Sequence, residues 1–212
     1  MNPLDRRQER TVCCFWVFDL DGTLTVPAHD FEGIRRELRL PEGRPILEEI
    51  AKLPEAIALQ AMARLDQIEY EVACKAVPQP GAVRVVSELR SRHCQVGVFS
   101  RNSARSVQET LKQCGMETLF RPSHIMARES CAPKPDPKGI HMLLSRWQGR
   151  VRETVMVGDY LYDMQAGRKA GVITVGFDSD GLFRWKAYAD YCVTDLPTIL
   201  ELPIVPPKRA GT

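Results

Sequence analysis

The stretch Val12-Cys-Cys-Phe-Trp-Val-Phe18 leads directly into Asp19-Leu-Asp21-Gly22-Thr-Leu-Thr25. Its first half is short and rich in Val, Cys and aromatic residues, which favours a β-strand. Asp and Gly then end that strand in a turn. Asp19 and Asp21 stand two apart in extended chain, so both carboxylates point to the same side while Leu20 points into the core. The pair is a candidate for chemistry at a strand end, and a plain turn that uses Asp and Gly would look the same.

Strands and helices alternate after Pro78-Gln-Pro80-Gly81, which is typical of a hinge. This succession predicts an α/β fold with an open, doubly wound, mainly parallel sheet and helices on both of its faces. The expected helices cover 82–92, 103–114, 137–147 and 162–170, and the expected strands after the first cover 95–99, 124–127, 154–157, 172–175 and 191–193.

A helical block is expected between the first strand and this hinge, over residues 28–77. Its apolar residues recur at helical spacing, at Phe31, Ile34 and Leu38 and again at Ile57, Ala61, Leu65, Ile68 and Val72. Pro41, Pro45 and Pro54 divide the block into two or three helices, with Pro54 in a first helical turn. We therefore predict a core formed by residues 1–27 and 78–202, a small all-helical cap over 28–77, and a loose tail over 203–212.

The composition is ordinary for a soluble globular protein, with 44% hydrophobic and 26% charged residues in 212. No run of eighteen apolar residues is present, and the early apolar run is too short for a secretory signal, so we expect a cytoplasmic protein with no membrane partner. A net charge of +2 with dispersed arginines disfavours nucleic acid as a partner. Either a monomer or a homodimer is compatible with these features.

For two groups of residues we favour a structural role over a functional one. Seven cysteines without a CxxC pair fit reduced thiols, and the alternative of a zinc site lacks clustered Cys and His ligands. The arginines at 35, 36, 39 and 44 fit a solvated helix face better than a substrate site.

Polar residues follow three further predicted strands: Ser100, Lys134, and Asp159 with Asp163. Because the carboxyl ends of parallel strands meet at one edge of a sheet, these residues and the first acid pair should face one crevice. Carboxylates packed beside a phosphate need a cation between them, and Mg²⁺ prefers oxygen ligands. Each element also has a structural alternative: Ser100, Asp159 and Asp163 could cap helices, and Lys134 could be a surface lysine.

Taken in order, these four elements resemble the signature of the haloacid dehalogenase superfamily. They are Asp19-Leu-Asp21-Gly22-Thr23-Leu24-Thr25, Ser100, Lys134-Pro135, and Gly158-Asp159 with Asp163. The helical block is similar, by position and helicity, to the small cap of the phosphoglycolate phosphatase-like branch. The resemblance covers residues 12–175.

The resemblance implies a Mg²⁺-dependent phosphatase of small-molecule phosphomonoesters that passes through an aspartyl-phosphate. Asp19 would be the nucleophile, and Asp21 would protonate the leaving oxygen and then activate water. The ion would be held by Asp19, the Asp21 backbone carbonyl and Asp159, with Asp163 nearby. Because the dehalogenases of this superfamily do not need the second acid, Asp21 disfavours dehalogenation.

Phosphoryl oxygens would be bound by Ser100 and Lys134 in such an enzyme. Arg101 and Asn102 follow Ser100 where the family more often has small residues, so they are candidates for substrate binding. Arg101 is expected either to reach a substrate carboxylate or to lie in solvent.

Three alternatives stay open at this point. A phosphomutase would share the core and differ in its cap. A phospho-accepting signalling module would also use clustered aspartates and a lysine, but it has a different motif order. A binding protein with a vestigial site would not need every reactive group present here. The cap carries no motif that specifies the substrate, and phosphoglycolate is suggested by resemblance alone.

Overall fold

The computed structural model of this chain describes residues 12–205. Six strands form one sheet in the order β3-β2-β1-β4-β5-β6, and every neighbouring pair is parallel. They are β1 (Phe15–Phe18), β2 (Gln95–Phe99), β3 (Ile125–Met126), β4 (Thr154–Gly158), β5 (Ile173–Phe177) and β6 (Tyr191–Val193). The predicted α/β fold is confirmed, and the strand before Asp19 is central to the sheet.

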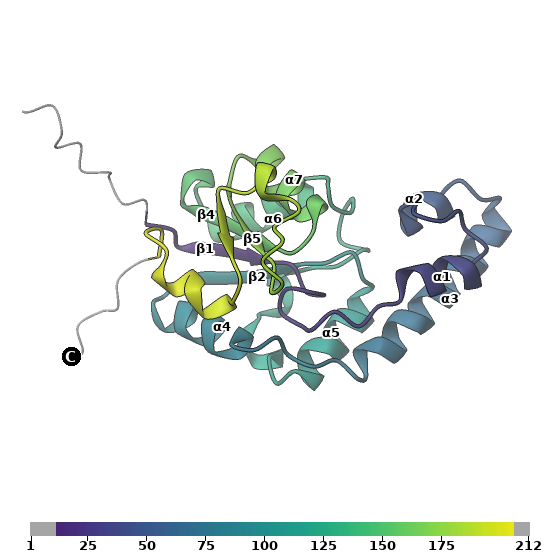
Figure 1. The fold of residues 1–212 in the computed structure, drawn as a ribbon, viewed down its shortest axis with the longest axis horizontal. Helices are drawn as coiled ribbons and strands as arrows, with labels where there is room; N and C mark the ends of the chain where they lie inside the picture. Colours follow the sequence, from purple (N-terminus) through teal and green to yellow (C-terminus); the bar gives the residue numbers. More distant parts are fainter. Residues whose placement is uncertain (1–11, 206–212) are drawn as a thin grey trace, which may run out of the picture.

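Helices cover both faces of the sheet because successive side chains of β1 point in opposite directions. Trp16 and Phe18 belong to the buried cluster shared with α4 (Ala82–Ser91) and α5 (Ala104–Gln113). Val17 belongs to a second cluster, shared with α6 (Lys138–Trp147) and α7 (Leu161–Ala170). The two helical layers are visible on either side of the strands in Figure 1. Five short 3-10 helices complete this part: η1 (Glu117–Leu119), η2 (Pro122–His124), η3 (Val151–Glu153), η4 (Lys186–Tyr188) and η5 (Leu196–Glu201).

Three helices follow β1 in sequence and extend beyond one end of the sheet (Figure 1). They are α1 (Phe31–Glu37), α2 (Ile46–Ile50) and α3 (Glu55–Ala73), and we call them the cap helices. Ile34, Ile50 and Leu65 form the centre of their own small apolar cluster. The helices were expected in this block, whereas the domain boundaries at 28 and 77 stay predictions. Pro54 is the N-cap of α3 rather than part of its first turn.

The buried face of α3 differs from the predicted one. Its buried residues are Ala61, Leu65, Glu69 and Ala73, a stripe that repeats every four residues. Ile57, which the periodicity placed on this face, is 52% exposed. Ile57 continues the four-residue spacing, but it lies in the first turn of α3, outside the apolar cluster of the cap helices that buries Ala61 and Leu65.

The end of the described chain is fixed on the core. Ile204 is buried, and its carbonyl oxygen accepts a hydrogen bond of 2.7 Å from the backbone N–H of Cys13. The expectation of a loose tail from residue 203 is therefore wrong up to residue 205, because Ile204 belongs to the buried core cluster and Val205 packs against it. Its remainder, 206–212, lies outside the described residues.

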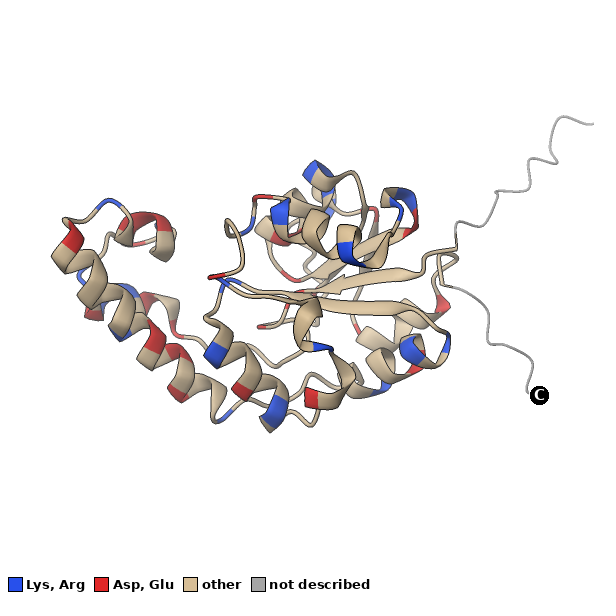
Figure 2. Ribbon diagram, turned by 180° about the vertical axis from the view of Figure 1, so that it is seen from behind, with Lys and Arg blue, Asp and Glu red and all other residues tan. Residues whose placement is uncertain are grey.

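Charged residues of both signs are distributed over the cap helices and the core helices, as Figure 2 shows. Within residues 12–205, no helix is long and apolar enough to cross a membrane.

Candidate active site

Asp19 and Asp21 lie in the loop that follows β1, at the end of the sheet nearest the cap helices. The backbone N–H of Asp19 donates to the Val157 carbonyl of β4 at 2.8 Å, which fixes the first acid beside the neighbouring strand. Gly22 then adopts a φ of +84°, a conformation that favours glycine. Leu20 is buried in the core between the two acids, as the sequence predicted.

Asp159 and Asp163 follow β4 and complete an acidic group with Asp19. Oxygen atoms of these three carboxylates lie within 4.8 Å of one another. Asp159 also accepts a hydrogen bond of 3.2 Å from the Thr23 hydroxyl. Because a Cβ at Gly22 would collide with the Asp159 carboxylate, only glycine leaves room for this approach. The sheet thus brings together residues that are 140 positions apart in sequence, as predicted from the strand ends.

Lys134 is buried among these acids and contacts both Asp19 and Asp163, with its Nζ 2.7 Å from an oxygen of Asp163. Burial alone would lower the pKa of this amine, but the carboxylates of Asp163 and Asp19 raise it well above its usual value. Lys134 is therefore a permanent positive charge in the site and not a surface lysine.

The acids of the site have raised pKa values because they are buried. Burial raises the pKa of Asp21 and that of Asp163 to about 6 each, against the opposing influence of Lys134. The pKa values of Asp19 and Asp159 are raised by burial as well, and for Asp159 the nearby charges of Asp19 and Asp163 add to the effect. One lysine thus faces an excess of acids, so the group retains negative charge that a cation could neutralise.

Ser100 is buried at the end of β2 and lines the same cavity as the acids. Its hydroxyl accepts a hydrogen bond of 3.1 Å from the Asn102 backbone. Ser100 does not cap the helix that follows it, because the N-cap of α5 is Ser103. Asp163 does help to cap α7, because its second oxygen accepts a hydrogen bond of 3.0 Å from the backbone N–H of Tyr160 at the start of that helix.

Asn102 and Arg101 both line the cavity and also contact other side chains of the protein, and their roles in substrate binding stay predictions. Asn102 donates its side-chain amide to the Asp21 carboxylate at 2.8 Å, so it orients the second acid. The Arg101 side chain is largely covered, with 21% of its surface exposed, and is already paired within the protein. Its guanidinium donates to the carbonyl of Lys134 and to the Glu48 carboxylate of α2, because the cap helices bring that acid within reach.

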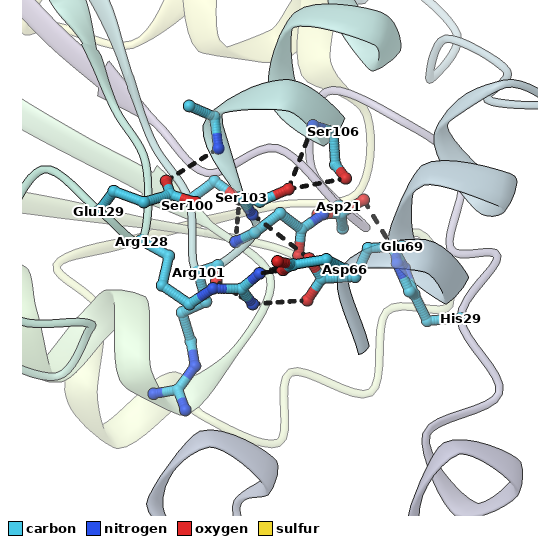
Figure 3. Close-up of polar contacts among 12 residues, drawn as sticks. Asp21, His29, Asp66, Glu69, Ser100, Arg101, Ser103, Ser106, Arg128 and Glu129 are labelled. Carbon is cyan, nitrogen blue, oxygen red and sulfur yellow. Dashed lines mark hydrogen bonds and ion pairs between the residues drawn. The ribbon is translucent and has the colours of Figure 1, made fainter. Parts of the chain in front are cut away.

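Charged residues that the sequence analysis missed join α3 to the core (Figure 3). Glu69 is buried, accepts hydrogen bonds of 2.9 and 3.1 Å from the Arg128 guanidinium, and accepts another of 3.3 Å from the Ser103 backbone. Arg128 also contacts Asp66. A signal existed in the sequence, because Glu69 stands four residues after Leu65 in the buried stripe of α3, where a carboxylate needs a partner.

A cavity of about 310 Å³ lies between the acids of the core and the cap helices. Asp19, Asp21, Ser100 and Lys134 line it on the core side. Of the four arginines expected on a solvated face, three are exposed, but Arg35 lines this cavity. The interpretation of that patch was therefore wrong for one residue, because α1 turns Arg35 toward the core.

All seven cysteines are free thiols in the structure. Among the residues at 12–205, the group of side chains that could hold a metal ion consists of aspartates alone, so the zinc alternative has no support.

The chain matches the model of the haloacid dehalogenase-like hydrolase family over residues 16–171. It is 32% identical to the uncharacterized hydrolase YOR131C of Saccharomyces cerevisiae, over 193 residues that make up 88% of each chain. The protein therefore belongs to the haloacid dehalogenase-like hydrolase family, as the four motifs implied.

Two further comparisons agree with this assignment. Pyrophosphatase PpaX of Bacillus velezensis is 27% identical over 204 residues, which cover 88% of this chain and 94% of PpaX. The crystal structure of a predicted phosphoglycolate phosphatase from Haemophilus somnus shares the fold, with a TM-score of 0.70 and 19% identity. That match covers 89% of this chain and 97% of the other.

Proposed function

We propose that this protein is a Mg²⁺-dependent phosphatase that hydrolyses small-molecule phosphomonoesters through a phosphoryl group carried on Asp19. The observation that carries the proposal is the position of the Asp19 carboxylate, which contacts Lys134, lies within 4.8 Å of oxygens of Asp159 and Asp163, and lines a cavity that Ser100 also lines. Membership of a hydrolase family and similarity to a protein named pyrophosphatase support chemistry at phosphorus.

Asp19 is the residue suited to attack phosphorus. Burial raises the pKa of Asp19, and its contact with Lys134 opposes that effect because the ammonium favours the charged form. An oxygen of Asp19 forms a bond to phosphorus while the bond from phosphorus to the leaving alcohol breaks. Lys134 and the Ser100 hydroxyl bind the oxygens of the transferring group, where they offset its charge.

Asp21 is the residue suited to move the proton. It lines the same cavity, and its amide contact with Asn102 holds the carboxyl group in one orientation. It gives its proton to the oxygen of the departing alcohol. It then takes a proton from the water that attacks phosphorus, which releases phosphate and restores the Asp19 carboxylate.

The donor set fits Mg²⁺, since Asp19, Asp159 and Asp163 offer carboxylate oxygens within 4.8 Å of one another and the Asp21 backbone carbonyl stands in the same loop. A second reason why Mg²⁺ fits this site is that the aspartates carry more negative charge than Lys134 can neutralise. When bound, the ion would neutralise charge on the transferring phosphoryl group and help to orient it.

The test is phosphate release from a panel of phosphorylated metabolites, with Mg²⁺ and with EDTA. We expect turnover that requires the metal, and loss of turnover to background in Asp19→Asn. Asp21→Asn should lose about a hundredfold or more in kcat. Circular dichroism and Tm of each variant serve as the folding controls. A folded Asp19→Asn variant with normal phosphate release would overturn the proposal.

The same assays separate the phosphatase from the phosphomutase. Sugar phosphates would be followed for isomerisation as well as for release of phosphate. Isomerised product without phosphate release would favour the mutase. Family membership already favours a hydrolase over a phospho-accepting signalling module, and a stable phosphoprotein without turnover would reverse that preference.

A further inference from the structure

The cavity above Asp19 has two chemically different halves. Its core side carries the acids, Ser100 and Lys134 described above. Its cap side carries mainly apolar side chains from α1, α2, α3 and the loop before α2: Phe31, Ile34, Pro45, Ile46, Leu47 and Leu65. A phosphoryl group bound beside Asp19 therefore directs the rest of its molecule toward an apolar wall.

Aromatic rings are present on both sides of this space. Phe31 begins α1 and is 54% exposed although it lines the cavity. Tyr160 and Tyr162, at the start of α7, line it from the core side and pack against each other edge to face, with ring centroids 5.1 Å apart. Such rings offer flat apolar surfaces and favourable geometry to another ring.

The cations of the cavity are already paired. Arg35 donates to Glu32 at 2.7 Å and to the Arg44 carbonyl at 2.7 Å. Arg101 is held by both oxygens of Glu48, and Lys134 is held by the two acids already described. A second negative charge on the substrate, such as the carboxylate of phosphoglycolate, would have to compete with one of these existing contacts or remain unpaired at an apolar wall, and an unpaired buried charge is costly.

The acid on the cap side is paired as well. Both oxygens of Glu69 accept from Arg128, and one also accepts from the Ser103 backbone. A substrate hydroxyl or ammonium group would therefore compete with existing contacts there. An apolar group would gain from leaving water without disturbing any of them.

We propose that the alcohol part of the substrate is an uncharged, apolar group of about the size of one ring, bound between Phe31 and the tyrosines at the start of α7. This inference rests on the proposed phosphatase function and names its substrate class. The cavity volume of about 310 Å³ has room for a phosphoryl group together with one ring. Phosphoglycolate, suggested by family resemblance, is thereby disfavoured.

The test compares benzyl phosphate with ethyl phosphate and 2-phosphoglycolate, all esters of alkyl alcohols, so that differences in leaving-group activation stay small. We expect kcat/KM for benzyl phosphate to exceed that for ethyl phosphate by about tenfold or more, because burial of several carbon atoms separates them. Phosphoglycolate should be the poorer substrate. Equal or better turnover of phosphoglycolate would overturn the inference while leaving the phosphatase function intact.

Variants of two exposed residues of the cap helices test whether the preference for benzyl phosphate depends on Phe31. Phe31→Ala should lower the preference for benzyl phosphate over ethyl phosphate by about tenfold, mainly through a higher KM for benzyl phosphate. Leu59→Ala is the matched control, because Leu59 is also a large apolar residue of the cap helices, is 67% exposed and does not line the cavity. An equal preference in wild type and Phe31→Ala would contradict the assigned wall.

Binding gives a readout that does not depend on turnover. Benzylphosphonate and ethylphosphonate cannot be hydrolysed, and their Kd values can be measured by calorimetry with Mg²⁺ present. Tighter binding of benzylphosphonate, lost in Phe31→Ala, would support the inference even if no ester were hydrolysed. Equal Kd values would overturn it, whereas failure of the phosphatase function would appear as absent phosphate release from every ester.

Discussion

Arg101 of the core and Glu48 of α2 form a two-oxygen ion pair, with Nη2 of the arginine 3.0 Å from Oε1 and 2.7 Å from Oε2. The same guanidinium donates to the Lys134 carbonyl and lies over the Tyr162 ring, 5.0 Å from its centroid. One side chain thus connects the cap helices, the lysine loop and the wall of the cavity.

Glu48→Gln should raise KM more than it lowers kcat. The pair is partly exposed, with Glu48 at 40%, so its coupling energy should be about 0.2–1 kcal/mol. Without it the cap side of the cavity is held less firmly over the substrate, and we expect KM to rise by up to roughly fivefold. Steady-state kinetics check this. Glu49→Gln is the control, because its partner Lys52 lies on the cap side too, at 2.6 Å. Equal effects of the two substitutions would contradict the bridging role.

Gly22→Ala should abolish Mg²⁺-dependent activity in a protein that still folds. The substitution forces an alanine into positive φ and drives its Cβ into the Asp159 carboxylate, which moves an expected metal ligand. The backbone strain alone costs about 1 kcal/mol. Calorimetric titration with Mg²⁺ and phosphate release measure the two consequences.

Gly115→Ala is the matched control for that variant. Gly115 has a φ of +66°, but a Cβ there would meet no atom within 4 Å. It should lower Tm by a similar amount and leave Mg²⁺ affinity unchanged. If both variants bind Mg²⁺ as the wild type does, Gly22 is needed only for the turn.

The sequence predicted the parts of the site that depend on sheet topology. Asp19, Ser100, Lys134 and Asp159 each follow a strand, and parallel strands bring their carboxyl ends together whatever the details of packing. The spacing of two between the first acids likewise predicted that they share one side of the chain. These inferences needed only periodicity and turn chemistry.

The parts that depend on how the cap helices meet the core could not be predicted in the same way. The contacts of Arg101 with Glu48 and of Arg128 with Glu69 join segments 53 and 59 residues apart, and no local pattern fixes the angle between them. The buried stripe of α3 was shifted for the same reason. Periodicity identifies a helix, but only its neighbours determine which side is covered.

Glu69→Ala should destabilise the protein by about 3 kcal/mol, because it removes a buried carboxylate and leaves the partly buried Arg128 guanidinium with Asp66 as its one acidic partner in the network. Asp66→Ala should cost less than about 1 kcal/mol, since the Asp66 side chain is 45% exposed and its contact is screened by water. Glu69→Gln, which preserves part of the hydrogen bonding, should fall between them. Urea unfolding gives all three free energies. A cost for Asp66→Ala as large as that for Glu69→Ala would show that the burial of Glu69 is not what matters.

The metal-free protein should gain stability from Asp163 as pH falls. Its pKa is about 6 in the folded protein, because burial disfavours the charged form, against about 3.9 in an unfolded chain. Between about pH 6 and 4 the folded state therefore binds more protons than the unfolded state, so the free energy of unfolding rises as pH falls through this window, by about 1–3 kcal/mol.

Burial lowers the pKa values of His29 and His124, which changes the stability in the opposite direction as pH falls. The measurement is thus the difference between wild type and Asp163→Asn in EDTA, in which the histidine contributions cancel. Parallel pH profiles of the two proteins would contradict the raised pKa of Asp163.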